Sequence, residues 1–269
     1  MAVAEQVERQ DRQKQVKLTK RSWLKLAMLP ATGALAIGLW WLTAVLSGLP
    51  PFILPPPDLV WGRFLQVLTD GSLVHHTLVT SYEVGMGLLL GLLLATLTGY
   101  TLAKSPVLER LLAPYIVASQ SIPTVAIAPL LVIWFGSGRL SKILVATLIV
   151  FFPVLVNTVV GVRSVPDELY ELMRSLRATR WQIFTKLEFP SALPVLFGGL
   201  KIGATLSVIG AVVGEFVGAD EGLGFLINLA RGLYDTPLVF VAIFTLVALA
   251  MGLYAMVNAL EGWLLRWRS

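Results

Sequence analysis

The chain has 269 residues, of which 56% are hydrophobic and 14% are charged, and its formal net charge is +5. An ordinary soluble domain contains about 45–50% apolar residues, so this composition argues against a soluble protein and favours one that lies in lipid. The chain has no cysteine, which excludes a disulfide framework and thiolate chemistry.

A basic segment comes first. Residues 1–25 hold seven Lys or Arg and show almost no apolar periodicity, which predicts a basic cytoplasmic tail. The apolar run after this tail is longer than the core of a signal peptide, so we expect it to stay uncleaved. Nucleic-acid binding is not expected, because no aromatic or repeat pattern accompanies the charges.

Apolar runs long enough to cross a bilayer, about 20 residues each, fill most of the remaining chain. Five uncharged runs are clear, at residues 26–57, 84–103, 111–138, 143–162 and 236–260. A sixth, at about 193–219, contains Lys201 and Glu215 but stays apolar between them. The runs are continuous, whereas the strands of a membrane β-barrel alternate apolar and polar residues. The sequence therefore predicts an all-α, polytopic membrane protein with six transmembrane helices.

The segment after the first span combines prolines with an amphipathic pattern. Its prolines favour an extended chain, and Asp58 can then cap a short helix. One face of this helix would carry Leu59, Val60, Phe64 and Val67. We expect it to pack along the outer membrane surface.

The distribution of Lys and Arg predicts the orientation, because positive residues are retained on the cytoplasmic side. If the first span starts from the cytoplasm, 17 Lys and Arg lie in or next to the cytoplasm and four lie outside. We therefore expect a multi-pass protein of the cytoplasmic membrane with both termini cytoplasmic. The expected divisions are the tail 1–25, the first span with its external segment at 26–75, the core at 76–262 and a cytoplasmic tail at 263–269.

The most polar internal segment, residues 164–190, reads as two short helices. The stretch Ser164, Val165, Pro166, Asp167 is typical of a helix start, and a helix with one apolar face would run to about Arg177. Thr179 and Gln182 then form a capping box of the T-x-x-Q type, and Pro190 would end the second helix. The prediction is a cytoplasmic helix-turn-helix, which in an arbitrary membrane protein could simply rest on lipid headgroups.

The spacing in this segment resembles the EAA loop of permease subunits in ATP-binding cassette importers. That pattern is E-A-A, three residues, Gly, nine residues and I-x-L-P, and here Glu171 and Pro190 agree with it. Leu172 and Met173 stand for the two alanines, and Leu187 and Phe189 are conservative replacements.

Arg177 stands where the EAA pattern has Gly, a residue that adopts a positive φ without strain.

Other stretches extend the resemblance from about Pro55 to the C-terminus. "ILPPPDLVW" is similar to a segment of importer permeases for nitrate, sulfonates and taurine. "SIPTVAIAPLLVIWFGSGRLSKI" and "FFPVLVNTVVGVRSVP" are similar to the third-span and fourth-span signatures of the same group.

The resemblance implies a machine of several chains. It implies a dimer of ATP-binding subunits, a second permease subunit that would form a homodimer, and an external substrate-binding protein, with lipid around the spans. The helix-turn-helix at 164–190 would be the coupling loop that docks on the ATPase, with apolar anchors and a charged rim. The residues assigned to this coupling are Glu171, Leu172, Met173, Arg174, Arg177, Trp181 and Phe184.

No cofactor and no enzymatic activity are expected of this chain. It lacks the G-x-x-x-x-G-K-[ST] motif, so ATP hydrolysis would belong to the partner subunit. His75 and His76 are expected in an external loop, without the further ligands that complete a zinc site, so no metal is expected.

Polar groups inside the spans are costly in lipid and suggest function. The candidates for a translocation path are Gln120, Asn157 and Glu215. Interhelical hydrogen bonds explain the first two equally well, and a position at the membrane interface explains the third. Lys201 lies near the cytoplasm, where its long side chain can snorkel. Glycines are expected to permit close helix packing, at Gly87, Gly91, Gly198, Gly199, Gly210 and Gly214.

The substrate prediction rests on "VIGAVVGEFVGADEGLG", residues 208–224. This stretch resembles the branch that imports vitamin-like heterocycles such as riboflavin or a thiamine pyrimidine precursor. The alternatives are the same machinery for nitrate, sulfonate or taurine, and, in a different class, an ATP-independent channel or carrier.

Overall fold

The computed structural model describes residues 30–266, which are helical and contain no strand. The predicted tail 1–25, the start of the first predicted span and residues 267–269 lie outside this range. The chain divides into two compact units between Gly62 and Arg63.

The first unit contains an apolar helix, Pro30–Leu46, that is shorter than the predicted span at 26–57. It ends where Gly48 adopts a φ of 63° and a proline-rich segment follows, because prolines do not continue a helix. The indole nitrogen of Trp40 donates a hydrogen bond to the Pro55 carbonyl at 3.1 Å, which holds this segment on the helix.

Helix α2 (Pro57–Thr69) crosses the boundary between the units and carries Asp58 in its first turn, where the sequence predicts a helix start. Val60 and Val67 are buried and Phe64 is half-buried, as expected for a packed face, whereas Leu59 is exposed.

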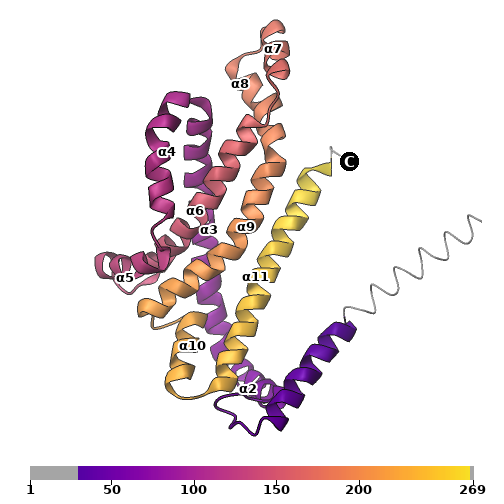
Figure 1. The fold of residues 1–269 in the computed structure, drawn as a ribbon, viewed down its shortest axis with the longest axis vertical. Helices are drawn as coiled ribbons and strands as arrows, with labels where there is room; N and C mark the ends of the chain where they lie inside the picture. Colours follow the sequence, from indigo (N-terminus) through magenta and orange to yellow (C-terminus); the bar gives the residue numbers. More distant parts are fainter. Residues whose placement is uncertain (1–29, 267–269) are drawn as a thin grey trace, which may run out of the picture. The chain divides into compact units, whose positions relative to one another are not determined.

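Four long helices form the second unit: α3 (Ser72–Lys104), α6 (Arg139–Arg163), α9 (Phe189–Gly218) and α11 (Thr236–Leu264). They run alongside one another (Figure 1). Helix α7 (Asp167–Ser175) and helix α8 (Arg180–Ile183) lie at one end, here called the α7 end. Helix α10 (Leu223–Gly232) lies at the opposite, α10 end.

Small residues let α6 pack closely between α3 and α9. On α3 they recur every fourth residue, at Gly87, Gly91, Ala95 and Gly99, and on α9 they include Gly199, Gly203, Gly210 and Gly214. A Cβ on Gly91 would stand 2.9 Å from the Cβ of Val150, and one on Gly210 would stand 2.6 Å from the Cα of Ala146. The expectation of close packing is thus confirmed, except at Gly198, whose surroundings are open.

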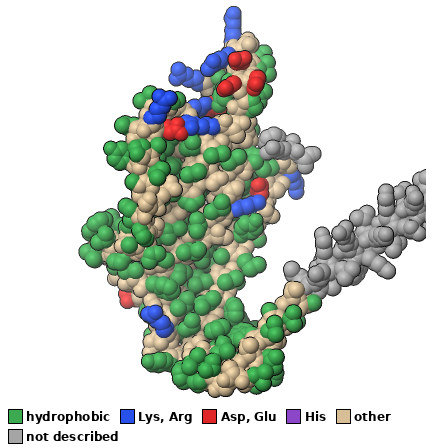
Figure 2. Space-filling view, viewed as in Figure 1, with side chains coloured by type: hydrophobic (Ala, Val, Ile, Leu, Met, Phe, Trp, Pro, Cys, Tyr) green, Lys and Arg blue, Asp and Glu red, His purple; other side chains and the backbone are tan. Residues whose placement is uncertain are grey.

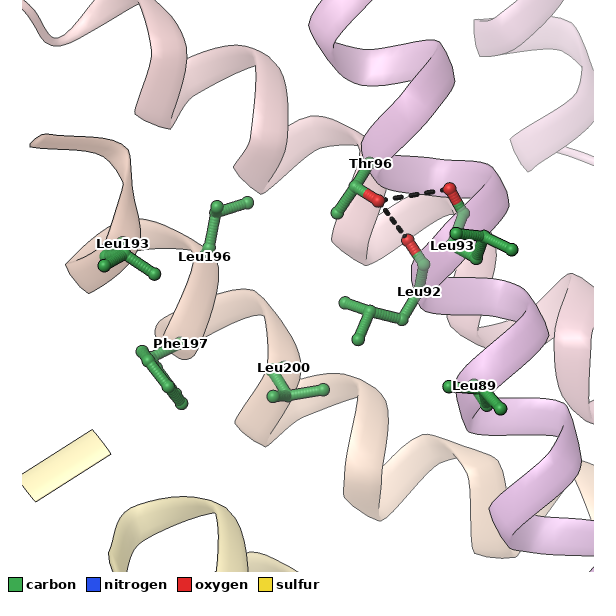
Figure 3. A pocket seen from close by; sticks show the side chains of 8 residues that line it. All are labelled: Leu89, Leu92, Leu93, Thr96, Leu193, Leu196, Phe197 and Leu200. Carbon is green, nitrogen blue, oxygen red and sulfur yellow. Dashed lines mark hydrogen bonds between the residues drawn. The ribbon is translucent and has the colours of Figure 1, made fainter. Parts of the chain in front are cut away.

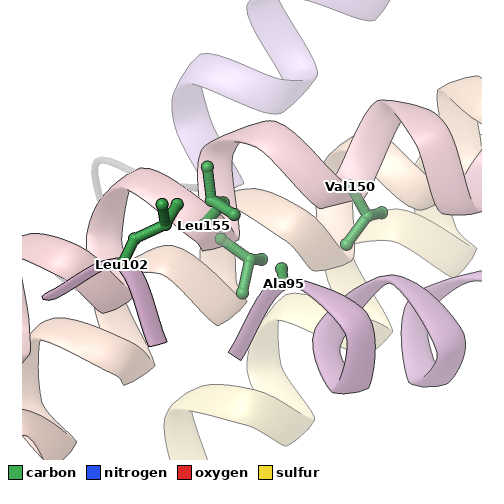
Figure 4. Close-up of a cluster of buried hydrophobic side chains, with 5 residues drawn as sticks. Ala95, Leu102, Val150 and Leu155 are labelled. Atoms are coloured by element: carbon green, nitrogen blue, oxygen red, sulfur yellow. The ribbon is translucent and has the colours of Figure 1, made fainter. Parts of the chain in front are cut away.

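An apolar cluster fills the contact between α3 and α6 (Figure 4). It consists of Ala95, Leu102, Val150, Val154 and Leu155, all buried. Because the two backbones approach so closely, branched side chains from α6 are enough to fill the space beside Ala95.

The third predicted span, 111–138, is not one continuous helix. Helix α4 (Pro106–Gln120) and helix α5 (Thr124–Phe135) meet at an angle of 90°. Pro123 has no backbone N–H and takes an extended ψ of 115°, and a residue before proline, here Ile122, disfavours the helical region. We call residues 120–124 the elbow.

The described residues contain four helices long and apolar enough to cross a membrane, or five if α4 and α5 count as one broken span. The count of six therefore stays a prediction. Figure 2 shows hydrophobic side chains over the flank of the second unit and charged side chains gathered at the α7 end. Such an apolar flank suits a lipid environment.

We expect Gly210→Ala to destabilise the bundle by about 1–3 kcal/mol, because its methyl group meets the α6 backbone. The matched control is Gly198→Ala on the same helix, which meets nothing within 4 Å. Thermal unfolding of the detergent-solubilised proteins measures the difference, and equal melting temperatures would contradict the close packing.

Candidate coupling site and translocation residues

The predicted helix-turn-helix is present, with a different start. Helix α7 begins at Asp167, and its N-cap residue is Pro166, which provides no side-chain cap. The hydroxyl of Ser164 instead donates to the Gly161 carbonyl at 2.8 Å and so finishes α6. Two carboxylates, Asp167 and Glu168, lie in the first turn of α7, where the helix dipole favours negative charge.

Arg177 forms the turn after α7 in a left-handed conformation, with a φ of 53°. Its N–H donates to the Arg174 carbonyl, and the N–H of Ala178 donates to the Met173 carbonyl, both at 2.9 Å. This is a Schellman motif, which usually has Gly at the left-handed position. Arg177 therefore adopts a positive φ, which Gly would take without strain, at a cost of about 1–2 kcal/mol.

The capping box at the start of α8 is confirmed. The Gln182 N–H donates to Thr179 Oγ1 at 3.3 Å, and the Thr179 N–H donates to Gln182 Oε1 at 2.8 Å.

Pro190, by contrast, does not end the second helix. Helix α8 continues through a π-helical turn, η1 (Phe184–Glu188), into α9, so that the 39 residues from Arg180 to Gly218 are helical without a break. A proline removes one helical hydrogen bond and crowds the preceding turn. The wider π turn directly before Pro190 accommodates this defect.

Apolar side chains project from the turn at the α7 end. Leu172, Leu176 and Trp181 are 54%, 68% and 70% exposed, and Leu169 on the same face of α7 is also exposed. We call these four residues the docking face. Leu176 and Leu169 were not among the residues assigned to coupling from the sequence, although they belong to the same three-and-four spacing.

Phe184 does not project as an anchor. Its ring packs against Tyr100, Trp181 and Phe189, with centroid distances of 5.4, 5.6 and 6.1 Å. Its place at the start of the π turn directs the side chain toward α3, which spacing alone could not show.

The remaining assigned residues lie around the same turn. Met173 is half-buried, and Glu171, Arg174 and Arg177 are exposed. Glu171 and Arg174 line a polar cavity of about 640 Å³ beneath α7, whose other lining residues include Asp167 and Tyr170.

A buried carboxylate fastens this region to α3. Glu188, in the π turn, accepts hydrogen bonds from Lys104 Nζ and from the Tyr100 hydroxyl, the latter at 2.9 Å. Lys104 also lies 3.3 Å from the hydroxyl of Tyr170 on α7. This contact could not be predicted from residue spacing, because Lys104 and Glu188 are 84 residues apart.

Glu215 lies in a buried polar cluster near the α10 end. It accepts hydrogen bonds from Thr80 Oγ1, at 2.7 Å, and from the Gly224 N–H at the start of α10. Thr80 in turn accepts from the Leu223 N–H at 2.8 Å. Gly222 leaves no room for a side chain beside the Glu215 carboxylate, which explains a glycine at a φ of 110°.

Two further ionisable residues join this cluster, and sequence reasoning missed both. Lys142 is 1% exposed and donates to the carbonyls of Ser137 and Gly218, the latter at 2.6 Å. Glu83 is buried and has one oxygen, Oε2, without a hydrogen-bond partner among the described residues. Both line a polar cavity of about 440 Å³. Each lies just before an apolar run, at 84–103 and at 143–162, so hydropathy alone did not place them inside a span.

The loop before α10 closes over this cavity. Glu221 pairs with Arg139 at 2.8 Å and with His75 at 3.1 Å, and the hydrogen bond from Arg139 holds the pKa of the Glu221 carboxyl below its usual range. His76 Nδ1 accepts the Gly222 N–H at 3.0 Å. Both histidines belong to the first turns of α3, so the expectation that they lie in a loop was wrong.

The three residues assigned to a translocation path do not meet. Gln120 is exposed at the elbow. Asn157 donates to the Pro153 carbonyl of its own helix at 2.8 Å and packs against Gly199. Lys201, expected to snorkel, is half-buried and forms a salt bridge with Glu261 of α11 at 2.5 Å.

An apolar groove of about 270 Å³ lies between α3 and α9 (Figure 3). Leucine and phenylalanine side chains line it, and Thr96 contributes its one hydroxyl. That hydroxyl already donates to the carbonyls of Leu92 and Leu93, so its proton is not available to a polar solute in the groove. Among residues 30–266, no group of three or more His, Asp or Glu could hold a metal ion.

The long apolar helices and the projecting helix-turn-helix define a polytopic helical membrane protein. A family model described as the binding-protein-dependent transport system inner membrane component matches residues 87–266. The chain belongs to this family and is a permease subunit of an ATP-binding cassette importer.

Curated relatives and a solved structure agree with this assignment. The chain is 51% identical over 252 residues to the riboflavin transport system permease protein RibX of Chloroflexus aurantiacus, and the match covers 94% of each chain. It is 38% identical over 231 residues to the formylaminopyrimidine transport permease protein ThiX of Halalkalibacterium halodurans, which covers 86% of this chain and 92% of the relative.

A structure of the MetNI methionine ABC transporter in an inward facing conformation matches with a TM-score of 0.64 at 21% identity. The match covers 72% of this chain and 96% of that chain, and it shows a shared fold.

We expect Arg177→Gly to tighten the turn after α7, because Gly adopts the left-handed conformation without the cost of about 1 kcal/mol. Hydrogen exchange at the Ala178 amide, which reports the Schellman bond, should slow about fivefold. The control is Arg174→Gly inside α7, which should speed exchange by about the same factor. Faster exchange in Arg177→Gly would contradict the strain.

Proposed function

We propose that this permease imports riboflavin or a related vitamin-like heterocycle. The observation that carries the proposal is the 51% identity, over 94% of each chain, to a riboflavin transport permease. The similarity to a formylaminopyrimidine permease supports the same class of solute. Taurine and sulfonate permeases are more distant, at 32% identity, so the oxyanion alternative has less support.

Uptake of labelled riboflavin tests this proposal. The chain is expressed with its ATPase and its external binding protein in cells that cannot make riboflavin. We expect ATP-dependent riboflavin uptake that excess taurine does not reduce. Uptake of taurine without uptake of riboflavin would contradict the substrate assignment, and riboflavin uptake by the lone chain would favour an ATP-independent carrier.

The docking face is proposed to seat in a groove of the ATPase subunit. Leu172, Leu176 and Trp181 give it exposed apolar area, and Glu171 and Arg174 give it a charged border. Such exposed leucine and tryptophan side chains beside charged residues at the end of a bundle suit a protein partner better than bulk water.

We expect Leu176→Asp, and likewise Met173→Asp or Glu171→Lys, to abolish riboflavin uptake while the chain stays in the membrane. A charge at the centre of a buried apolar contact is costly because it must give up its hydration. Leu176→Met is the control and should retain uptake within about twofold, since it keeps the apolar contact. Normal uptake by Leu176→Asp would contradict the coupling role.

A second copy of this chain is proposed to cover the elbow. Gln120, Ser121 and Ile122 are exposed there, and non-helical backbone at membrane depth does not face lipid. A second copy would satisfy these groups or enclose water beside them, and Gln120 would then line the shared path. Asn157 and Glu215 would hold in place the helices that border this path.

We expect Ile122→Cys to cross-link two copies of the permease in the assembled importer, and the chain's lack of native cysteine makes the result unambiguous. Leu97→Cys, on an exposed part of α3, is the control and should not cross-link. The absence of any product at position 122 would place the second copy elsewhere.

The α7 end is proposed to face the cytoplasm, with both termini on that side. Nine Lys and Arg of the second unit, from Lys104 to Arg266, belong to segments at or leading to this end. The divisions at 25, 75 and 262 remain part of this proposal. Labelling that reaches the C-terminus from outside intact cells would contradict it.

A further inference from the structure

Glu188 is the most deeply buried charged residue at the α7 end, and α3 satisfies both of its oxygens. The carboxylate is 4% exposed. Oε1 accepts from Lys104 Nζ, and Oε2 accepts from the Tyr100 hydroxyl at 2.9 Å. Lys104 and Tyr100 lie one turn apart on α3, so a single helix holds the carboxylate at two points.

Lys104 extends the same contact to the first helix of the loop. Its ammonium lies 3.3 Å from the Tyr170 hydroxyl and 4.9 Å from the centre of that ring. Helix α7, which carries part of the docking face, and the π turn that follows α8 therefore both contact one lysine at the end of α3. We call Lys104, Glu188, Tyr100 and Tyr170 the α3 clasp.

An aromatic contact lies beside the clasp. The Tyr100 ring meets Phe184 edge to face at 5.4 Å, and Phe184 contacts Trp181 of the docking face. If Trp181 were displaced, the aromatic contact through Phe184 and Tyr100 would push α3. The ion pair between Glu188 and Lys104 would pull α3 at the same time.

Helix α3 connects the clasp to the buried cluster near the α10 end. It is one helix of 33 residues, and Thr80 near its start donates to Glu215 and accepts from the Leu223 N–H. An unbroken helix transmits displacement along its axis because its backbone hydrogen bonds resist stretching. Helix α3 therefore contacts the coupling loop near its C-terminal end and the loop before α10 near its N-terminal end.

We propose that Lys104 and Glu188 are positioning residues for transport, which make α3 move with the coupling loop when the ATPase displaces it. This inference rests on the proposed docking of the loop on an ATPase. Without the clasp, the docking face would still follow the ATPase, but α3 and the α10 end would not follow the docking face. ATP hydrolysis would then proceed with little transport.

The test uses the full importer in proteoliposomes and measures solute transported per ATP hydrolysed. The solute is riboflavin, or taurine if the unmodified complex carries that instead. Lys104→Met and Glu188→Gln should each lower the ratio at least tenfold, with ATP hydrolysis kept within about threefold. The charge swap, Lys104→Glu with Glu188→Lys, should recover at least a third of the ratio.

The matched control is Arg163→Gln, which removes an exposed ion pair at the same end. Arg163 holds Glu109 with two hydrogen bonds, at 2.6 and 2.5 Å, which join α6 to α4, and it also lines the cavity beneath α7. We expect its transport ratio to be unchanged. A fall as large as that of Glu188→Gln would show a general effect of lost ion pairs and would overturn the proposal.

An unchanged ratio in Lys104→Met and Glu188→Gln, or a swap no better than either single variant, would also overturn it. If those variants do not assemble, Tyr100→Phe keeps the ring and removes one hydrogen bond, and it should lower the ratio severalfold. An unchanged ratio there would contradict the clasp. Failure of the docking proposal is distinct, because Leu176→Asp would then transport normally whatever the clasp variants do.

Discussion

The close approach of α6 to α3 and α9 is the contact on which the rest of the second unit depends. Lipid offers helices no hydrophobic driving force, so their association rests on close packing and on internal polar contacts. Glycines on α3 and α9 bring both backbones against α6, and the α6 side chains fill the space that the glycines leave. The three helices thereby form a block from which the loops at each end project.

Ionisable side chains connect this block of three helices to the loops at its two ends. At the α7 end, Glu188 is buried against α3, and near the α10 end Glu215 and Lys142 bind backbone groups of the neighbouring loops. Lys201 of α9 forms a salt bridge with Glu261 of α11 between these two ends. Charged groups are energetically costly in lipid unless they are paired or hydrogen-bonded. The transport cycle must therefore either keep these contacts or break them.

Much of the fold could be predicted from the sequence, because hydropathy and local capping act over short distances. The spans at 84–103, 143–162 and 236–260 lie within α3, α6 and α11, and the T-x-x-Q box starts α8 as expected. These features depend on residues within a few turns of one another.

The misses arose where local and tertiary effects compete. Pro123 interrupts the helix in an apolar run that hydropathy predicts as one continuous span. Pro190 follows a π turn that accommodates it, so the helix continues through it. Phe184 turns inward because α3 presents Tyr100 to it, and Lys142 is buried because it donates hydrogen bonds to the carbonyl of Gly218, 76 residues away, and to that of nearby Ser137. Partners so far away in the chain leave no mark in the spacing.

The central claim is that the face formed by Leu169, Leu172, Leu176 and Trp181 contacts the ATPase. A photoreactive side chain placed at Leu176 of the assembled importer tests it most directly. We expect cross-links from position 176 to the ATPase subunit and none from a probe at the equally exposed Leu233, beside α10. Cross-links from position 233, or none from position 176, would contradict it.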